Sequence, residues 1–84
     1  MNLRLGFIGI VIEDPLRATE INSILSRFGH LIAGRMGVPR LSHNEAGISV
    51  ITLIVQGTTD ELGALTGQLG NINGVQVRSA LSTK

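Results

Sequence analysis

The sequence predicts one α+β domain, residues 1–84, with the ferredoxin-like order βαββαβ: a four-stranded antiparallel sheet with two helices on one face. The strongest observation is the stretch 47–56, GISVITLIVQ, which is β-branched almost throughout and apolar on both alternating phases. Residues 3–13 have the same two-sided pattern, which is typical of a central strand covered on both faces. Two segments with helical periodicity alternate with these strands, and 84 residues suffice for a single domain of this kind.

The first part of the chain predicts a strand and then a helix. Residues 3–13 form the strand, and the two glycines inside it indicate a bulge or a close backbone approach. Asp14 and Pro15 fit a helix start, because an aspartate side chain accepts a hydrogen bond from a free backbone N–H and proline suits the first helical position. An apolar stripe with helical spacing follows, formed by Ile21, Ile24, Leu25 and Phe28. We expect Gly29 to end this helix in a left-handed cap.

Residues 31–38 predict the second strand. Glycines interrupt it, it contains Arg35 and it ends at Pro39, and these features are tolerated at the edge of a sheet. The polar segment 40–46 is interpreted as a hairpin loop that leads into the central strand over 47–56.

The second helix follows the central strand. Thr58 and Glu61 have the spacing of a capping box. Its apolar stripe is formed by Leu62, Leu65, Leu69 and Ile72. Three glycines inside the helix each weaken it by about 1 kcal/mol relative to alanine, so we expect packing to hold it, with Gly63 and Gly67 in close contact with a neighbouring element. Residues 75–81 then form a peripheral strand with one apolar and one polar face.

The apolar pattern of the two central strands also predicts association. Two helices cover one face of a four-stranded sheet, yet strands 3–13 and 47–56 are apolar on both. Burying four such side chains is worth about 6–12 kcal/mol, which rivals the whole stability of a small domain at about 5–15 kcal/mol. Charged residues are only 15% of the chain, below the usual share of about 25%. We therefore expect the face opposite the helices to pack against copies of the same chain, as a homodimer or tetramer.

Composition disfavours several other classes of protein. The net charge is +1, no basic cluster occurs and the only aromatic residues are two phenylalanines, so nucleic-acid binding is not expected. The chain has no cysteine, which excludes disulfides, thiolate chemistry and cysteine metal sites. Its apolar runs are shorter than the roughly 18–20 residues of a membrane span, and a cytoplasmic location is expected. No catalytic triad, carboxylate pair or phosphate loop is recognisable, so neither an enzyme nor a cofactor is expected.

Four motifs resemble those of the iron-only hydrogenase system regulators. They are GIVIED at 9–14, GRMGVP at 34–39, GISVITLIV at 47–55 and ALTGQLG at 64–70, and together they extend over most of the chain. More broadly, the chain is similar to ACT-type regulatory domains and to the ligand-binding domain of nickel-responsive repressors. The resemblance implies an ACT-like ferredoxin fold, oligomers built through the sheet, and the sensing of a small molecule or metal. Direct repression of transcription is not expected, because the sequence holds no segment like the DNA-binding domain of those repressors.

Glu13 and Asp14 occupy the turn after the first strand. The resemblance to ACT-like domains implies that this turn helps to form an effector site at a subunit boundary. In the alternative interpretation, Asp14 only caps the helix. The two roles are compatible, because the backbone N–H groups of a helix start also suit an anion.

Arg35 is a further candidate for effector binding. The segment 34–37, GRMG, is similar to the GXXG loop of KH RNA-binding domains, but that loop joins two helices and here strand residues surround it. We therefore interpret Arg35 as an interface residue that pairs with Glu13 or Glu45, or as a ligand for an anionic effector.

His43 and Glu45 form the candidate metal site. They lie close together in the predicted hairpin loop, and an oligomer could supply matching groups from a neighbouring copy. In the alternative interpretation, each is a solvated loop residue.

Together these observations predict a non-catalytic regulatory or sensor domain that is homo-oligomeric and binds a small effector at a subunit interface. Glu13, Asp14 and Arg35 are the expected polar contacts. The resemblance implies a role in the regulation of an iron-only hydrogenase system. Two alternatives stay open: a metal-sensing oligomer, and a partner-binding module without a ligand.

Overall fold

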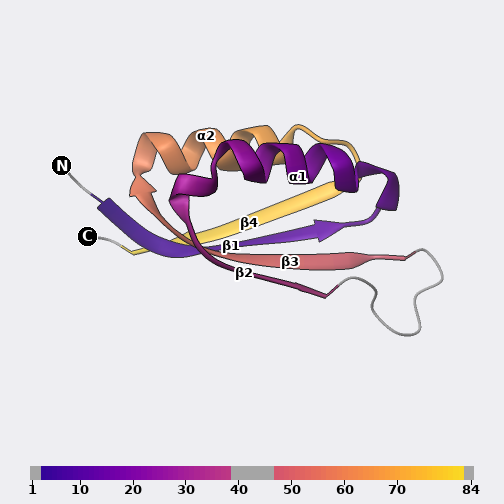
Figure 1. The fold of residues 1–84 in the computed structure, drawn as a ribbon, viewed down its shortest axis with the longest axis horizontal. Coiled ribbons are helices and arrows are strands. Elements are labelled where there is room, and N and C mark those ends of the chain that lie inside the picture. The colour runs from indigo at the N-terminus through magenta and orange to yellow at the C-terminus, as the bar shows by residue number, and fades with distance from the viewer. Residues whose placement is uncertain (1–2, 39–46, 83–84) are drawn as a thin grey trace.

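The computed structural model describes residues 3–38 and 47–82, and these form the predicted ferredoxin-like fold (Figure 1). The elements are β1 (Leu3–Ile12), a 3₁₀ turn (Pro15–Arg17), α1 (Ala18–Arg27), a second 3₁₀ turn (Gly29–Leu31), β2 (Ile32–Val38), β3 (Ser49–Thr58), α2 (Thr59–Gly70) and β4 (Val75–Leu81). All strand pairs are antiparallel, and the order in the sheet is β2-β3-β1-β4. The predicted central strands are therefore central, and the two weaker strands lie at the edges.

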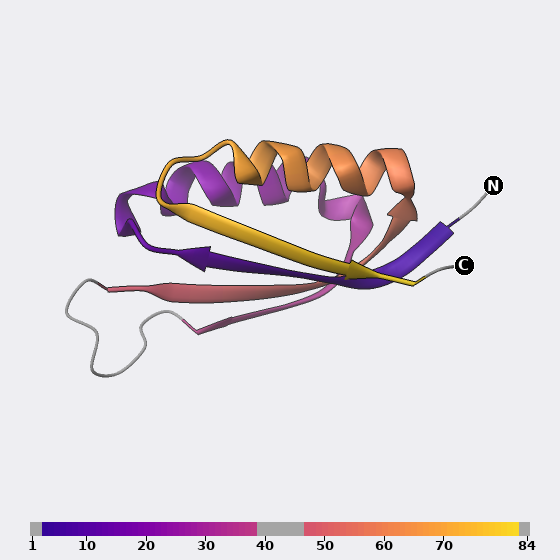
Figure 2. The same cartoon turned by 180° about the vertical axis from the view of Figure 1, so that it is seen from behind.

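Both helices lie on the same side of the sheet in both views (Figure 1, Figure 2). Ile8 and Ile10 of β1, together with Leu53 and Val55 of β3, are fully buried beneath them. Because directly opposed residues share a face of the sheet, the register of β1 against β3 places the other phase of both strands on the far side. The sequence does not determine which set of alternating residues faces the helices. In the structure, the set that includes Ile8 and Leu53 does so.

The core joins these strand residues to one stripe from each helix. The predicted stripes are confirmed, since Ile21, Ile24 and Leu25 of α1 and Leu62, Leu65 and Leu69 of α2 are buried. Ile72 is also buried, although it follows the end of α2, and Phe28 packs partly buried against the core. Among the described residues, no helix has the length and hydropathy needed to cross a bilayer.

The predicted end of the first helix is wrong. Phe28 rather than Gly29 is the C-cap of α1, and Gly29 begins a 3₁₀ turn. The N–H of Phe28 donates to the Ile24 carbonyl at 3.1 Å, and the N–H of Leu31 donates to the Phe28 carbonyl at 2.9 Å. These bonds tighten the helix end and carry the chain directly into the buried Leu31, so no left-handed residue is required there.

The capping box predicted at the start of α2 is confirmed, but the predicted close contact of its glycines is wrong. The N–H of Glu61 donates to the Thr58 hydroxyl at 3.1 Å, and the N–H of Thr58 donates to the Glu61 carboxylate at 2.9 Å, which completes the capping box. Gly63 and Gly67 were expected in close contact with a neighbouring element. Instead, a Cβ added at either position would meet no atom of a neighbouring element of the described chain within 4 Å. The buried leucine stripe, and not the glycine surface, holds this helix against the sheet.

Replacing Gly67 with alanine should stabilise the fold by about 1 kcal/mol, because alanine favours the helix and the position has room for its methyl group. In a domain of this size, that corresponds to a rise in Tm of roughly 4–8 °C in a thermal melt followed by circular dichroism. Gly6→Ala is the matched opposite: its Cβ would collide with the Ala80 carbonyl of β4, so Tm should fall. A lower Tm for Gly67→Ala would indicate that this helix surface packs against something outside the described chain.

Candidate functional site

The sheet surface away from the helices is apolar, as the sequence predicted. We call this surface the open face, and its large apolar residues include Leu5, Phe7, Val11, Met36, Val38, Val50 and Ile54. Leu5, Phe7 and Ile54 are 56%, 52% and 46% exposed, and Met36 of the edge strand is 66% exposed. Phe7 lies directly opposite Ile54, so the centre of the open face is a contiguous apolar surface.

The open face becomes polar toward the β4 edge. Gln76 is the register partner of Val11, and Arg78 is the partner of Gly9. An apolar centre with a polar margin is the composition of a protein interface.

A cleft of about 380 Å³ lies between α1 and the β2–β3 end of the sheet. Its wall is mainly apolar and comes from Ile12, Pro15, Ala18, Ile21, Val38, Val50 and Ile51. Two glycines and three polar side chains complete the lining: Gly37, Gly47, Asn22, Arg35 and Ser49. The cleft therefore offers an apolar interior with few polar groups, which is the usual character of a small-molecule site.

A β-bulge directs Arg35 toward this cleft. Ile32 is opposite Val55, but the next paired residue, Gly34, is opposite Ile54, so one extra residue is inserted into β2. Arg35 is consequently opposite the buried Leu53 and lies on the helix side of the sheet. Regular alternation from Ile32 would have placed it on the open face.

Arg35 bonds to a neutral partner. Its Nη2 donates to Oδ1 of Asn22 on α1 at 2.7 Å, and both residues are exposed. The predicted pairing with Glu13 is not formed, and Glu45 lies outside the described residues. Within residues 3–38 and 47–82, the ion pairs are those of Arg17 and of His30, so no carboxylate there neutralises Arg35.

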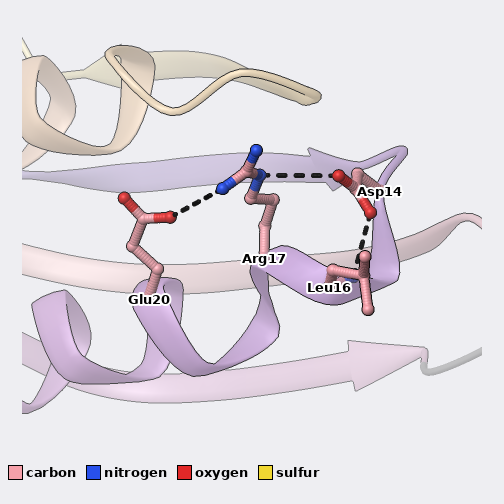
Figure 3. Close-up of polar contacts among 4 residues, drawn as sticks. All are labelled: Asp14, Leu16, Arg17 and Glu20. Carbon is pink, nitrogen blue, oxygen red and sulfur yellow. Dashed lines mark hydrogen bonds and ion pairs between the residues drawn. The ribbon is translucent and has the colours of Figure 1, made fainter.

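The Asp14 carboxylate is engaged at the helix start (Figure 3). Its Oδ1 accepts the Leu16 N–H at 3.0 Å, and its Oδ2 lies 3.4 Å from Nε of Arg17. Arg17 also contacts Glu20, with Nη1 3.5 Å from Oε1. Asp14 thus caps the 3₁₀ turn Pro15–Arg17, and α1 itself begins only at Ala18, without a side-chain cap. Neither Asp14 nor Glu13 lines the cleft, although Ile12 and Pro15 on either side of them do.

Sequence reasoning missed Asn22. It is one position from the buried Ile21, off the apolar stripe of α1, and it meets Arg35 only because α1 lies beside β2. A polar residue next to the stripe was one available signal, and Gly34, one of the glycines that interrupt the predicted strand, marks the place of the bulge that brings Arg35 to it.

The cleft and the open face meet at two residues. Val38 and Val50 are directly opposite each other in the register, on the phase that forms the open face, and both also line the cleft. A chain packed on the open face would therefore border the cleft.

A second cleft, also of about 380 Å³, has His30 and Glu61 in its lining. His30 Nε2 lies 3.9 Å from Oε2 of Glu61. The backbone N–H of Thr58 donates to the same carboxylate and holds the pKa of Glu61 below its ordinary value of 4.5. Glu61 therefore has a structural task at the helix start, which leaves the first cleft as the better candidate site.

The metal prediction concerns residues outside the described chain. His43 and Glu45 both fall within 39–46. Among the described residues, no group of three or more histidines and carboxylates could hold a metal ion.

Comparison with known proteins gives a consistent family and fold. The model of the TM1266-like family, described as iron-only hydrogenase system regulator, matches residues 4–79. The solved structure of TM1266 from Thermotoga maritima is 33% identical, with a TM-score of 0.83 over 95% of this chain and 98% of that one. A search of the curated proteins found no match.

Two further solved structures share the fold. The ACT domain of GTP pyrophosphokinase from Chlorobium tepidum is 24% identical, with a TM-score of 0.68 over 100% of this chain and 91% of that one. CPII, a nitrogen regulatory PII-like protein from Thiomonas intermedia K12 bound to ADP, AMP and bicarbonate, is 19% identical, with a TM-score of 0.54 over 98% and 99%. Both are similar to this chain in the arrangement of strands and helices.

Replacing Glu61 with glutamine tests the electrostatic part of the capping box, because glutamine retains the hydrogen-bonding shape without the charge. A carboxyl whose pKa is lowered by folding stabilises the protein above pH 4.5, and this contribution disappears as the pH falls through the folded-state pKa. Glu61→Gln should therefore melt below the parent protein near neutral pH, and the difference should close as the pH falls through the folded-state pKa, which lies below 4.5. Asp60→Asn, in the same turn but outside the capping box, is the control. A difference that stays constant into the acid range would contradict this account.

Proposed function

Because the chain belongs to the TM1266-like family of iron-only hydrogenase system regulators, we propose that it is a regulatory domain that assembles through its open face and binds a small effector at the subunit boundary. The family, together with the ACT and PII-like folds, supports a non-catalytic regulatory role. The system regulated would be that of an iron-only hydrogenase, as the family description says.

The observation that carries the proposal is the uncovered open face. Four large apolar side chains on it, Leu5, Phe7, Met36 and Ile54, are each 46–66% exposed. Because about half of each is already covered, burial by a second copy contributes about 3–6 kcal/mol, half of what fully exposed residues would give. That is still comparable with the stability of a small domain, about 5–15 kcal/mol. Among the elements formed by residues 3–38 and 47–82, none is left to cover this face.

Self-association is the simplest way to cover such a face. Strands β1 and β3 give it an apolar centre, and β4 gives it polar residues at one side. Two copies related by a two-fold axis would match centre to centre and would need no other partner.

Effector binding is supported by the position of the cleft. Val38 and Val50 belong to both the cleft and the open face, so assembly would add groups from a second copy beside the ligand. Arg35 stands at this cleft with a charge that no described carboxylate neutralises. The PII-like neighbour bound to ADP, AMP and bicarbonate is a case in which this fold serves small-molecule binding.

Light scattering after gel filtration, over a dilution series from about 100 to 1 µM, tests the assembly. We expect the parent protein to be a dimer or tetramer. Phe7→Asp and Ile54→Asp, which place a charge in the apolar centre, should shift it to monomer at all concentrations.

Leu16→Asp is the matched control. Leu16 is 86% exposed on the 3₁₀ turn before α1, away from the open face, so the same chemical change there should leave the oligomer intact. A parent protein that is monomeric throughout the series would refute self-assembly, and the open face would then be assigned to a different protein partner.

A further inference from the structure

We propose that the cleft beneath α1 binds a small hydrophobic monocarboxylate that has no amino group, such as an aliphatic or aromatic 2-oxo acid. This inference rests on the proposed function, since it names the chemical class of the effector for the same site. Three features of the cleft support it: an apolar wall, two polar side chains that are bonded to each other, and a described lining without an acidic group.

The wall fits an apolar body. Ile21 is fully buried at the helix side of the cleft, and Ile51 faces it from β3, with Ala18 and Pro15 along the start of the helix. A volume of about 380 Å³ is near the lower end for ligand pockets, which range over about 300–1,000 Å³. Such a space suits a branched aliphatic chain or one aromatic ring better than a nucleotide.

The mouth fits one carboxylate. Arg35 uses Nη2 in its bond to Asn22, which leaves other guanidinium N–H donors free to form the paired bonds that arginine makes to a carboxylate. Because Oδ1 of Asn22 accepts that bond, the amide NH₂ of Asn22 is also available as a donor. The Arg35–Asn22 bond therefore fixes the direction of both donors before a ligand arrives. A single cation matches a single negative charge, and not the several charges of a nucleotide.

The described lining has no carboxylate that would pair with an ammonium ion. It contains no aspartate or glutamate. Two acids, Glu13 and Asp14, lie in the sequence between the lining residues Ile12 and Pro15 but outside the lining itself, and Asp14 is engaged by the Leu16 N–H and by Arg17. Within the described lining, an amino acid would therefore lose hydration from its ammonium group without gaining a charged partner, which opposes binding. A 2-oxo acid of the same carbon skeleton does not incur this cost.

Isothermal titration with matched pairs tests the inference. The probes are 4-methyl-2-oxopentanoate against leucine, phenylpyruvate against phenylalanine, and hexanoate against 2-aminohexanoate, with acetate and AMP as single probes. We expect at least one of the three acids to bind, with a Kd about tenfold or more below that of its amino partner. Acetate, which lacks the apolar body, and AMP, which is too large and too charged, should bind more weakly than that acid.

Arg35→Gln and Arg27→Gln form the matched pair of variants. Both remove one positive charge from an exposed position, but Arg27 is in the last turn of α1 and does not line the cleft. Arg35→Gln should weaken binding of the acid by about tenfold or more, whereas Arg27→Gln should leave the Kd within about twofold. Circular dichroism melts of both variants establish that they are folded.

Three results would overturn the inference: none of the three acids binds at millimolar concentration, the amino partner binds as tightly, or Arg35→Gln binds as the parent does. Light scattering on the same samples separates this outcome from failure of the proposed assembly. An intact oligomer that binds no acid refutes the ligand class alone, and a monomer that binds one through Arg35 refutes the assembly alone.

Discussion

Two helices can cover only one face of a four-stranded sheet, and the main features of this protein follow from that limit. The central strands β1 and β3 are apolar on both phases, so a complete core forms from one phase only. Ile8, Ile10, Leu53 and Val55 enter the core, while Leu5, Phe7 and Ile54 stay on the open face. The chain is poor in charge, and charged residues do not interrupt the centre of that face. The hydrophobic core between the helices and the sheet is thus complete, but the apolar side chains of the open face stay exposed.

A single irregularity in an edge strand then gives the cleft its charge. The bulge after Ile32 shifts the rest of β2 by one residue, which moves Arg35 from the open face to the helix side. The same shift puts Met36 and Val38 on the open face, in register with Thr52 and Val50. One inserted residue therefore serves both surfaces: it removes a cation from the apolar face and supplies one to the cleft.

The fold was predictable because its signals are local and repeated. The stripes of α1 and α2, the capping box at Thr58 and the two-sided pattern of β1 and β3 each follow from residue spacing, and each is confirmed. The end of α1 was not predictable from Gly29, because a 3₁₀ turn satisfies the same carbonyl groups without a left-handed residue.

The candidate site was only partly predictable. Arg35 was identified from the sequence, but its partner was not, since the Arg35–Asn22 bond joins residues 13 positions apart through a bulge and a helix position. A carboxylate was the natural expectation for the partner of an arginine, and the structure has a neutral amide there instead. The phase of β1 and β3 under the helices was also beyond the sequence, because both phases are equally apolar and only packing distinguishes them.

Assembly and ligand binding would be coupled through the shared residues of the two surfaces. Under the proposed arrangement, a second copy on the open face covers Val38 and Val50, which also line the cleft, and so removes water from one side of it. Exclusion of water strengthens the attraction between Arg35 and a carboxylate, since the local dielectric constant falls. A ligand that binds the assembled form more tightly must in turn stabilise the assembly by the same free energy. Under the proposal, a small acid would thus change the population of the oligomer without any change in fold.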